Sequence, residues 1–135
     1  MMEPSVVREI LGPDGSVEST MEPSLWRQVM EPETASTLTT FMRAVVTSGT
    51  GTGAAIPGAD VIGKTGTAEN GNGAPHAWFV GVASKGSVDG DTLSPRYAIA
   101  VVVEIGGNSG SEATGGRVAA PIARKVLEAA LNDAP

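Results

Sequence analysis

The sequence lacks cysteine entirely, and this absence excludes several kinds of chemistry. A chain of 135 residues without a thiol cannot contain a disulfide, a thiolate zinc site or a cysteine nucleophile. Histidine occurs once, at His76, and no serine lies in the Gly-x-Ser-x-Gly pattern of a nucleophile elbow. The residues therefore indicate neither a Ser-His-Asp catalytic set nor a cofactor or metal site.

Basic residues are also scarce, because nine Lys and Arg stand against fifteen Asp and Glu, a formal net charge of −6 at pH 7. Such a balance offers no electrostatic footprint for nucleic acid. No apolar run approaches the roughly 20 residues that a membrane-spanning helix needs, and the N-terminus lacks the basic start and apolar stretch of a signal peptide. We therefore expect a soluble chain that binds no nucleic acid and carries no membrane segment.

Aromatic residues are few: two Trp, one Tyr and two Phe stand against eighteen Gly and nine Pro. A hydrophobic content of 41% in a chain of this length is enough for one modest core, built mostly from Val, Ile, Leu and Ala. The abundant glycine and proline predict many turns and close backbone approaches. One domain, or part of one, is the expected organisation.

The first third of the chain predicts a β-hairpin followed by a helix. Apolar residues before it and Ser16–Thr20 after it flank a Gly-Pro-Asp-Gly turn at 12–15. Pro32 fits the first turn of a helix, because its missing N–H has no partner there in any case. Apolar residues then recur at helical spacing as far as Val46, and the glycine-rich loop that begins at Gly49 should end the helix.

The remainder favours three extended strands joined by short links, at 61–68, 76–83 and 96–105. Consecutive strands with short links most simply form an antiparallel meander. A glycine-rich stretch, 106–116, leads to an apolar stripe at helical period that should lie across the sheet. Pro121 conflicts with a helix interior, so we expect regular helix to begin near Ala119 or Ala120. The predicted fold class is α+β, with a hairpin, a helix, a three-stranded antiparallel meander and a C-terminal helix packed on it.

Gly58 to Thr65 match the phosphate-loop pattern G-x-x-x-x-G-K-[ST]. The apolar residues Ala98 to Val103, followed by Glu104, also match the hydrophobic strand ending in an acidic residue that accompanies a phosphate loop. That pattern binds phosphate only where a strand precedes it and a helix follows, because the helix N-terminus supplies part of the anion site. Here a loop is predicted before Gly58, and the residues from Thr65 to Pro75 contain too many helix breakers to begin a helix. Nucleotide binding is therefore a disfavoured alternative.

A second pattern uses the same lysine. Lys64-Thr65-Gly66-Thr67 is the K-T-G signature of active-serine penicillin-binding proteins and β-lactamases. Further features surround it in order along the chain: Gly49-Thr50-Gly51 after the predicted helix, Ile56-Pro57-Gly58, Ala68-Glu69, His76 to Gly81, Gly115-Gly116 and Ala119-Ala120-Pro121. From Pro4 onward, this set resembles the C-terminal half of the transpeptidase domain of class B penicillin-binding proteins.

The resemblance implies a serine β-lactamase/transpeptidase-like fold and places the signature on a sheet-edge strand, where an extended peptide adds as a further strand. It implies that Lys64 brings positive charge near the substrate carboxylate and that the hydroxyls of Thr65 and Thr67 donate hydrogen bonds to it. Gly66 leaves room for this approach. The main-chain N–H of Thr67 is implied to be one oxyanion-hole donor. None of these roles is nucleophilic.

The sequence departs from the family pattern in two respects: no serine has a lysine three positions later, and no Ser-x-Asn triplet occurs. Residues 1–135 are therefore expected to be the C-terminal part of a transpeptidase domain and to be inactive alone. By resemblance, the parent protein cross-links peptidoglycan stem peptides through a serine acyl-enzyme, reacts with β-lactams and lies at the outer face of the bacterial plasma membrane, anchored by a segment absent here. The expected partner is the N-terminal part of that protein. The alternative is a stand-alone, non-catalytic binding or structural module.

Several other side chains have simpler structural interpretations. Glu69 fits a structural role and a place at the rim of the site equally well, and His76 is expected to form hydrogen bonds at a strand end rather than to act in catalysis. Trp26, Trp78 and Phe79 are expected to pack in apolar surroundings, although an alternating strand must expose one of the last two.

Overall fold

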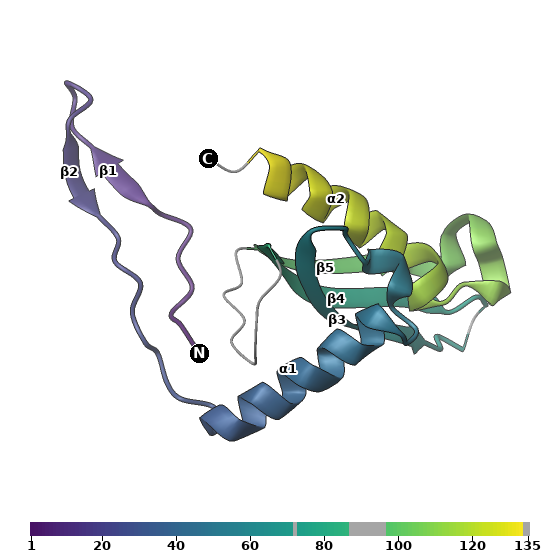
Figure 1. The fold of residues 1–135 in the computed structure, drawn as a ribbon. Coiled ribbons are helices and arrows are strands. Elements are labelled where there is room, and N and C mark those ends of the chain that lie inside the picture. The colour runs from purple at the N-terminus through teal and green to yellow at the C-terminus, as the bar shows by residue number, and fades with distance from the viewer. Residues whose placement is uncertain (72, 87–96, 134–135) are drawn as a thin grey trace. The chain divides into compact units, whose positions relative to one another are not determined.

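The computed structural model describes residues 1–71, 73–86 and 97–133, and it combines helices with two antiparallel sheets. The chain divides into two compact units, Met1–Ala35 and Ser36–Pro135. Figure 1 shows the elements of both. This composition confirms the expected α+β class.

The first unit is built around a β-hairpin. Strands β1 (Glu9–Leu11) and β2 (Val17–Thr20) pair antiparallel, as predicted, and a register shift follows Ile10. No residue between 1 and 35 is buried, so this unit has no core of its own. The expectation that Trp26 packs in apolar surroundings is wrong, because its side chain is 58% exposed and its ring lies 5.3 Å from the guanidinium carbon of Arg27.

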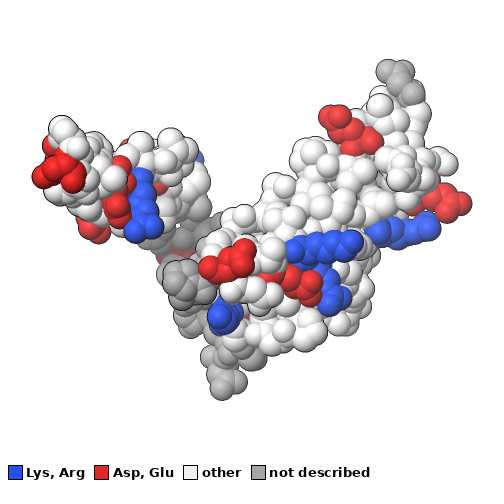
Figure 2. Space-filling model, turned by 90° about the horizontal axis from the view of Figure 1, so that it is seen from above, with Lys and Arg blue, Asp and Glu red and all other residues white. Residues whose placement is uncertain are grey.

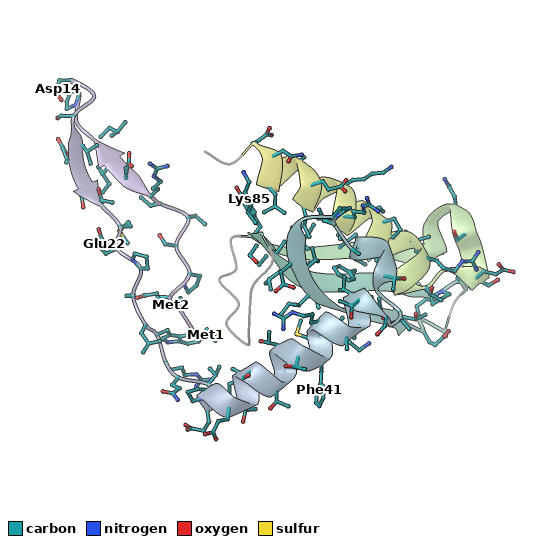
Figure 3. The ribbon with its side chains drawn as sticks, in the orientation of Figure 1. Met1, Met2, Asp14, Glu22, Phe41 and Lys85 are labelled. Carbon is teal, nitrogen blue, oxygen red and sulfur yellow. The ribbon has the colours of Figure 1, made fainter. Side chains whose placement is uncertain are left out.

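The turn of the hairpin is closed by local hydrogen bonds. Gly12 N donates to Ser16 O at 2.8 Å, and Gly15, with φ of 81°, adopts the left-handed backbone that glycine tolerates without strain. Asp14 lies at the tip of the hairpin (Figure 3), where its Oδ1 accepts from both the hydroxyl of Ser16 at 2.6 Å and the main-chain N–H of Ser16 at 3.0 Å. The carboxylate of Asp14 therefore fixes the turn.

Helix α1 (Pro32–Thr47) is anchored by its C-terminal turns. It begins at Pro32 and ends before Gly49, as predicted. Val46 is buried in the core, whereas Phe41 is 66% exposed and points away from the sheet (Figure 3). The guanidinium of Arg43 joins this end of the helix to the sheet, because its Nε and Nη2 donate to the carboxylate of Asp60 at 3.1 and 2.8 Å.

The central sheet is a three-stranded antiparallel meander in the order β3-β4-β5, as predicted. Its strands are β3 (Ala59–Ala68), β4 (His76–Lys85) and β5 (Tyr97–Val103). The last strand ends before the predicted Ile105, because Ile105 has a left-handed backbone with φ of 50° and its N–H donates to His76 Nδ1 at 3.2 Å. Residues 87–96, which include the predicted first residue of this strand, lie outside the described residues.

One aromatic ring fills the centre of the sheet. Phe79 is fully buried, and Gly63 and Gly81, which face each other across β3 and β4, leave the space that its ring occupies. A Cβ at Gly81 would lie 2.9 Å from the ring of Phe79. Trp78, on the opposite face, is 40% exposed. The prediction that β4 exposes one of these two aromatic residues is confirmed.

The last helical segments close the core against the sheet. The irregular segment η2 (Glu104–Glu112) and a short π-helix, η3 (Gly115–Ala119), precede helix α2 (Ala120–Asn132), which lies across the sheet (Figure 1). Pro121 falls in the first turn of α2, so the predicted start of regular helix is confirmed. The buried residues of α2 lie on its sheet-facing side: Ala120, Ala123, Leu127 and Leu131.

Candidate functional site

The signature residues lie on an edge of the described sheet. Strand β3 carries Lys64 in its middle. Within the described sheet, β3 pairs with β4 along one edge, and its other edge is unpaired. The chain remains extended through Ala68, and no helix begins after the lysine. The geometry of a phosphate loop is therefore absent, and the alternative of nucleotide binding is wrong for this segment.

The register of β3 turns the main-chain groups of Thr65 and Thr67 toward the open edge. Asp60, near the start of β3, donates its main-chain N–H to Gly86 O, on the residue that follows β4, at 3.1 Å. In an antiparallel ladder, residues that bond to the neighbouring strand alternate with residues that do not. The register of β3 with β4 is continuous, so counting in twos from Asp60 places the main chain of Gly66 on the β4 side. The N–H and C=O groups of its two neighbours then face outward, where a further strand can add.

A groove of about 590 Å³ lies along this edge. Its walls come from the loop after α1, from β3 and from the start of the last helical segment; its lining residues are Gly49, Thr50, Thr52, Lys64, Thr65, Gly66, Thr67, Thr114, Gly115, Gly116 and Arg117. Two of these side chains are cationic and none is acidic. The groove therefore suits an anionic ligand, and all four predicted signature residues line it.

The two cations are held in different ways. Lys64 is exposed, and its Nζ donates to the main-chain oxygen of Thr65 at 2.6 Å. Arg117 contacts Glu112, with 3.3 Å between Nη1 and Oε2, and both side chains are exposed. Contacts of this kind at an exposed surface contribute little to stability. Both cations are therefore available to an anion in the groove.

The wall of the groove formed by the start of the last helical segment packs closely on the backbone of β3. A Cβ at Gly115 would lie 2.7 Å from Gly66 O, and a Cβ at Gly116 would collide with the carbonyl oxygen of Thr50. Only residues without a side chain allow this approach. The Gly-Gly pair therefore sets how near Arg117 comes to the signature strand.

Thr50 lies against the signature strand through its side chain. Its Oγ1 and the Oγ1 of Thr65 are 2.6 Å apart, and either atom can be the donor. Reasoning from the sequence missed both Thr50 and Arg117 as groove residues. The only sequence feature that could have indicated Thr50 as a groove residue is its place in the Gly-Thr-Gly loop. No sequence feature indicated Arg117.

The remaining candidates lie outside the groove. His76 Nδ1 accepts from the main-chain N–H of Ile105 at 3.2 Å, as expected of a residue that forms hydrogen bonds at a strand end. Glu69 follows directly after β3, is exposed and does not line the groove. Neither side chain therefore lines the groove.

Other kinds of site find no support in the part of the chain that the structure describes. These residues contain no group of three or more His, Cys, Asp or Glu side chains that could hold a metal ion. No described helix has the length and apolar character needed to cross a bilayer. On the face that Figure 2 shows, Lys and Arg side chains are interspersed with acidic side chains.

The family of the chain follows from its similarity to known proteins. Residues 1–128 match the family described as penicillin binding protein transpeptidase domain. The chain belongs to this family. Within it, the chain is 41% identical to the peptidoglycan D,D-transpeptidase PbpA of Mycolicibacterium smegmatis, over 98% of the chain and 26% of that protein. It is 39% identical to PbpA of Mycobacterium tuberculosis strain H37Rv, over 99% of the chain and 26% of that protein.

Solved structures of the family have the same fold. The D,D-transpeptidase domain of a peptidoglycan glycosyltransferase from Eggerthella lenta matches with a TM-score of 0.76 and 34% identity, over 97% of the chain and 28% of that structure. Penicillin-binding protein A from M. tuberculosis, in an acyl-enzyme complex with ceftriaxone, matches with a TM-score of 0.76 and 39% identity, over 96% of the chain and 28% of that structure. The chain therefore spans about a quarter of the length of the relatives that it matches.

Proposed function

We propose that the chain is the C-terminal part of the transpeptidase domain of a larger D,D-transpeptidase, here called the parent protein. The parent protein cross-links peptidoglycan stem peptides through a serine acyl-enzyme and is inhibited by β-lactams. This chain supplies one wall of the site, which binds the substrate carboxylate and stabilises the oxyanion. The serine and its lysine base come from the remaining part of the parent protein, which is anchored at the outer face of the plasma membrane.

The observation that carries this proposal is the position of the signature on an open strand edge beside a cationic groove. An extended peptide can add to β3 through the outward main-chain groups of Thr65 and Thr67. Its terminal carboxylate then lies near Lys64, whose ammonium group stabilises a negative charge most strongly where water is displaced. The N–H of Thr67 is available to an oxyanion, and the loss of one such donor typically costs about 10²- to 10³-fold in rate.

The names of the relatives support this assignment. Two of them are named peptidoglycan D,D-transpeptidase PbpA, and one solved relative was captured as a ceftriaxone acyl-enzyme complex. The sequence of this chain has no serine followed three positions later by lysine. A covalent adduct is therefore expected on the parent protein, at a serine outside the 135 residues.

Intact-mass spectrometry after incubation with benzylpenicillin tests the proposal. The parent protein should gain the mass of one penicillin, and peptide mapping should place it outside this chain. The chain alone should gain nothing, whereas the chain mixed with the separately produced remainder should restore the adduct. An adduct on the chain alone would overturn the assignment of the nucleophile, and an unmodified parent protein would reject the proposed activity.

A further inference from the structure

We infer that Thr50 is a positioning residue that orients the hydroxyl of Thr65, so that a carboxylate in the groove receives the Thr65 proton. The inference rests on the proposed function of the signature strand as a carboxylate site. It gives the Gly-Thr-Gly loop a role in ligand binding that its sequence does not reveal.

The geometry places the two hydroxyls in direct contact inside the groove. Thr50 Oγ1 and Thr65 Oγ1 are 2.6 Å apart, which is short for a hydrogen bond between hydroxyl groups. Both residues line the groove that contains the cations Lys64 and Arg117. A carboxylate attracted by these cations therefore arrives beside the Thr50–Thr65 pair.

The main chain holds Thr50 from two sides. Gly51 N, on the next residue, donates to Val45 O in the last turn of α1 at 2.9 Å. Gly116 packs so closely on the carbonyl oxygen of Thr50 that a Cβ there would collide with it. Because the main chain is fixed in this way, the side chain of Thr50 reaches Thr65 from a defined direction.

The direction of the hydrogen bond then depends on the ligand. Each hydroxyl has one proton to donate and two lone pairs that accept. If Thr65 donates to Thr50, its lone pairs face an arriving carboxylate and repel it. If Thr50 donates instead, the proton of Thr65 is free for the carboxylate, and the two hydrogen bonds polarise each other in the favourable sense.

Two substitutions at position 50 separate the hydroxyl from the shape of the side chain. Thr50→Val keeps the branched shape and removes the donor, whereas Thr50→Ser keeps the donor. In the parent protein, we expect Thr50→Val to lower the second-order rate constant of acylation by benzylpenicillin about five- to tenfold, the effect of one hydrogen bond of ordinary strength. Thr50→Ser should remain within about twofold of the wild type by the same reasoning.

A double-mutant cycle with Thr65→Val tests whether Thr50 acts through Thr65. In the Thr65→Val background, Thr50→Val should cost less than about twofold, because the hydroxyl that it orients is gone. If Thr50→Val does not fold, Thr50→Ala compared with Thr50→Ser makes the same comparison. Equal costs in the two backgrounds, or a Thr50→Val rate equal to the wild-type rate, would overturn the inference and leave the proposed function standing. A wild-type parent protein that is not acylated would reject both.

Discussion

Gly115, at the start of the π-helix, lies with its backbone directly against the backbone of Gly66 on the signature strand. A Cβ added at Gly115 would lie 2.7 Å from the oxygen of Gly66 and 2.9 Å from its nitrogen, and closer still to the carbonyl oxygen of Trp78. This contact joins the last helical segment to β3 and β4 at once. It therefore fixes the depth of the groove.

Gly115→Ala is expected to destabilise the parent protein by about 1–3 kcal/mol, because the added methyl group meets backbone that cannot rotate away. Gly66→Ala is the matched control for stability, since its Cβ would meet only Trp78 Cβ, at 3.3 Å. Chemical denaturation of both variants measures the difference. A Gly115→Ala variant as stable as Gly66→Ala would contradict the close approach.

The ion pair between Arg43 and Asp60 should contribute more to stability than an exposed pair. It is formed by two hydrogen bonds, and its side chains are only 25% and 11% exposed. A double-mutant cycle with Arg43→Met and Asp60→Asn is expected to give a coupling energy of about 1–3 kcal/mol.

The pair Arg124–Glu128 is the matched control for this cycle. It joins residues four apart on α2, its side chains are 43% and 36% exposed, and its expected coupling energy is about 0.3–0.5 kcal/mol. Urea denaturation of the single and double variants gives both energies. Equal coupling energies would show that partial burial adds nothing to the Arg43–Asp60 pair.

The turn of the N-terminal hairpin should loosen in acid. The hydroxyl of Ser16, and then its main-chain N–H, lower the pKa of Asp14 from its ordinary value of 3.8. A carboxylate whose pKa is lowered by folding stabilises the folded turn above its ordinary pKa, and that stabilisation is lost as the pH falls through the lowered value. Titration by NMR should show a midpoint for Asp14 below 3.8, and Ser16→Ala should raise it. A midpoint unchanged by Ser16→Ala would refute this contact.

Local sequence patterns were sufficient to predict the elements that surround the site. Gly49 follows the end of α1, proline at 121 fits only a first turn, and alternation along β4 exposes one of its two adjacent aromatic residues, which the structure shows to be Trp78. The helix breakers after Lys64 likewise excluded the helix that a phosphate loop requires. In each case the structure depends on residues that are close together in the sequence, so a local pattern is enough to predict it.

The walls of the groove could not be predicted in this way. The contact of Gly115 with Gly66 joins η3 to β3, and the hydrogen bond between Thr50 and Thr65 joins the loop after α1 to the same strand across 15 residues of sequence. Neither contact follows from a local pattern. The end of β5 was also misplaced, because hydrophobic character continues to Ile105 although its N–H bonds to His76. Tertiary contacts override local propensity at these positions.

The charge of Lys64 tests the account most directly, and Lys85 provides the control. Lys85 is an exposed lysine at the end of β4, labelled in Figure 3, and it does not line the groove. The measurement is the second-order rate constant for acylation of the parent protein by benzylpenicillin, with Lys64→Met and Lys85→Met compared with the wild type. We expect Lys64→Met to react at least about tenfold more slowly, because a charged hydrogen-bond donor to the carboxylate is lost, and Lys85→Met to react at the wild-type rate. Equal rates for the two variants would contradict the assignment of the groove as the carboxylate site.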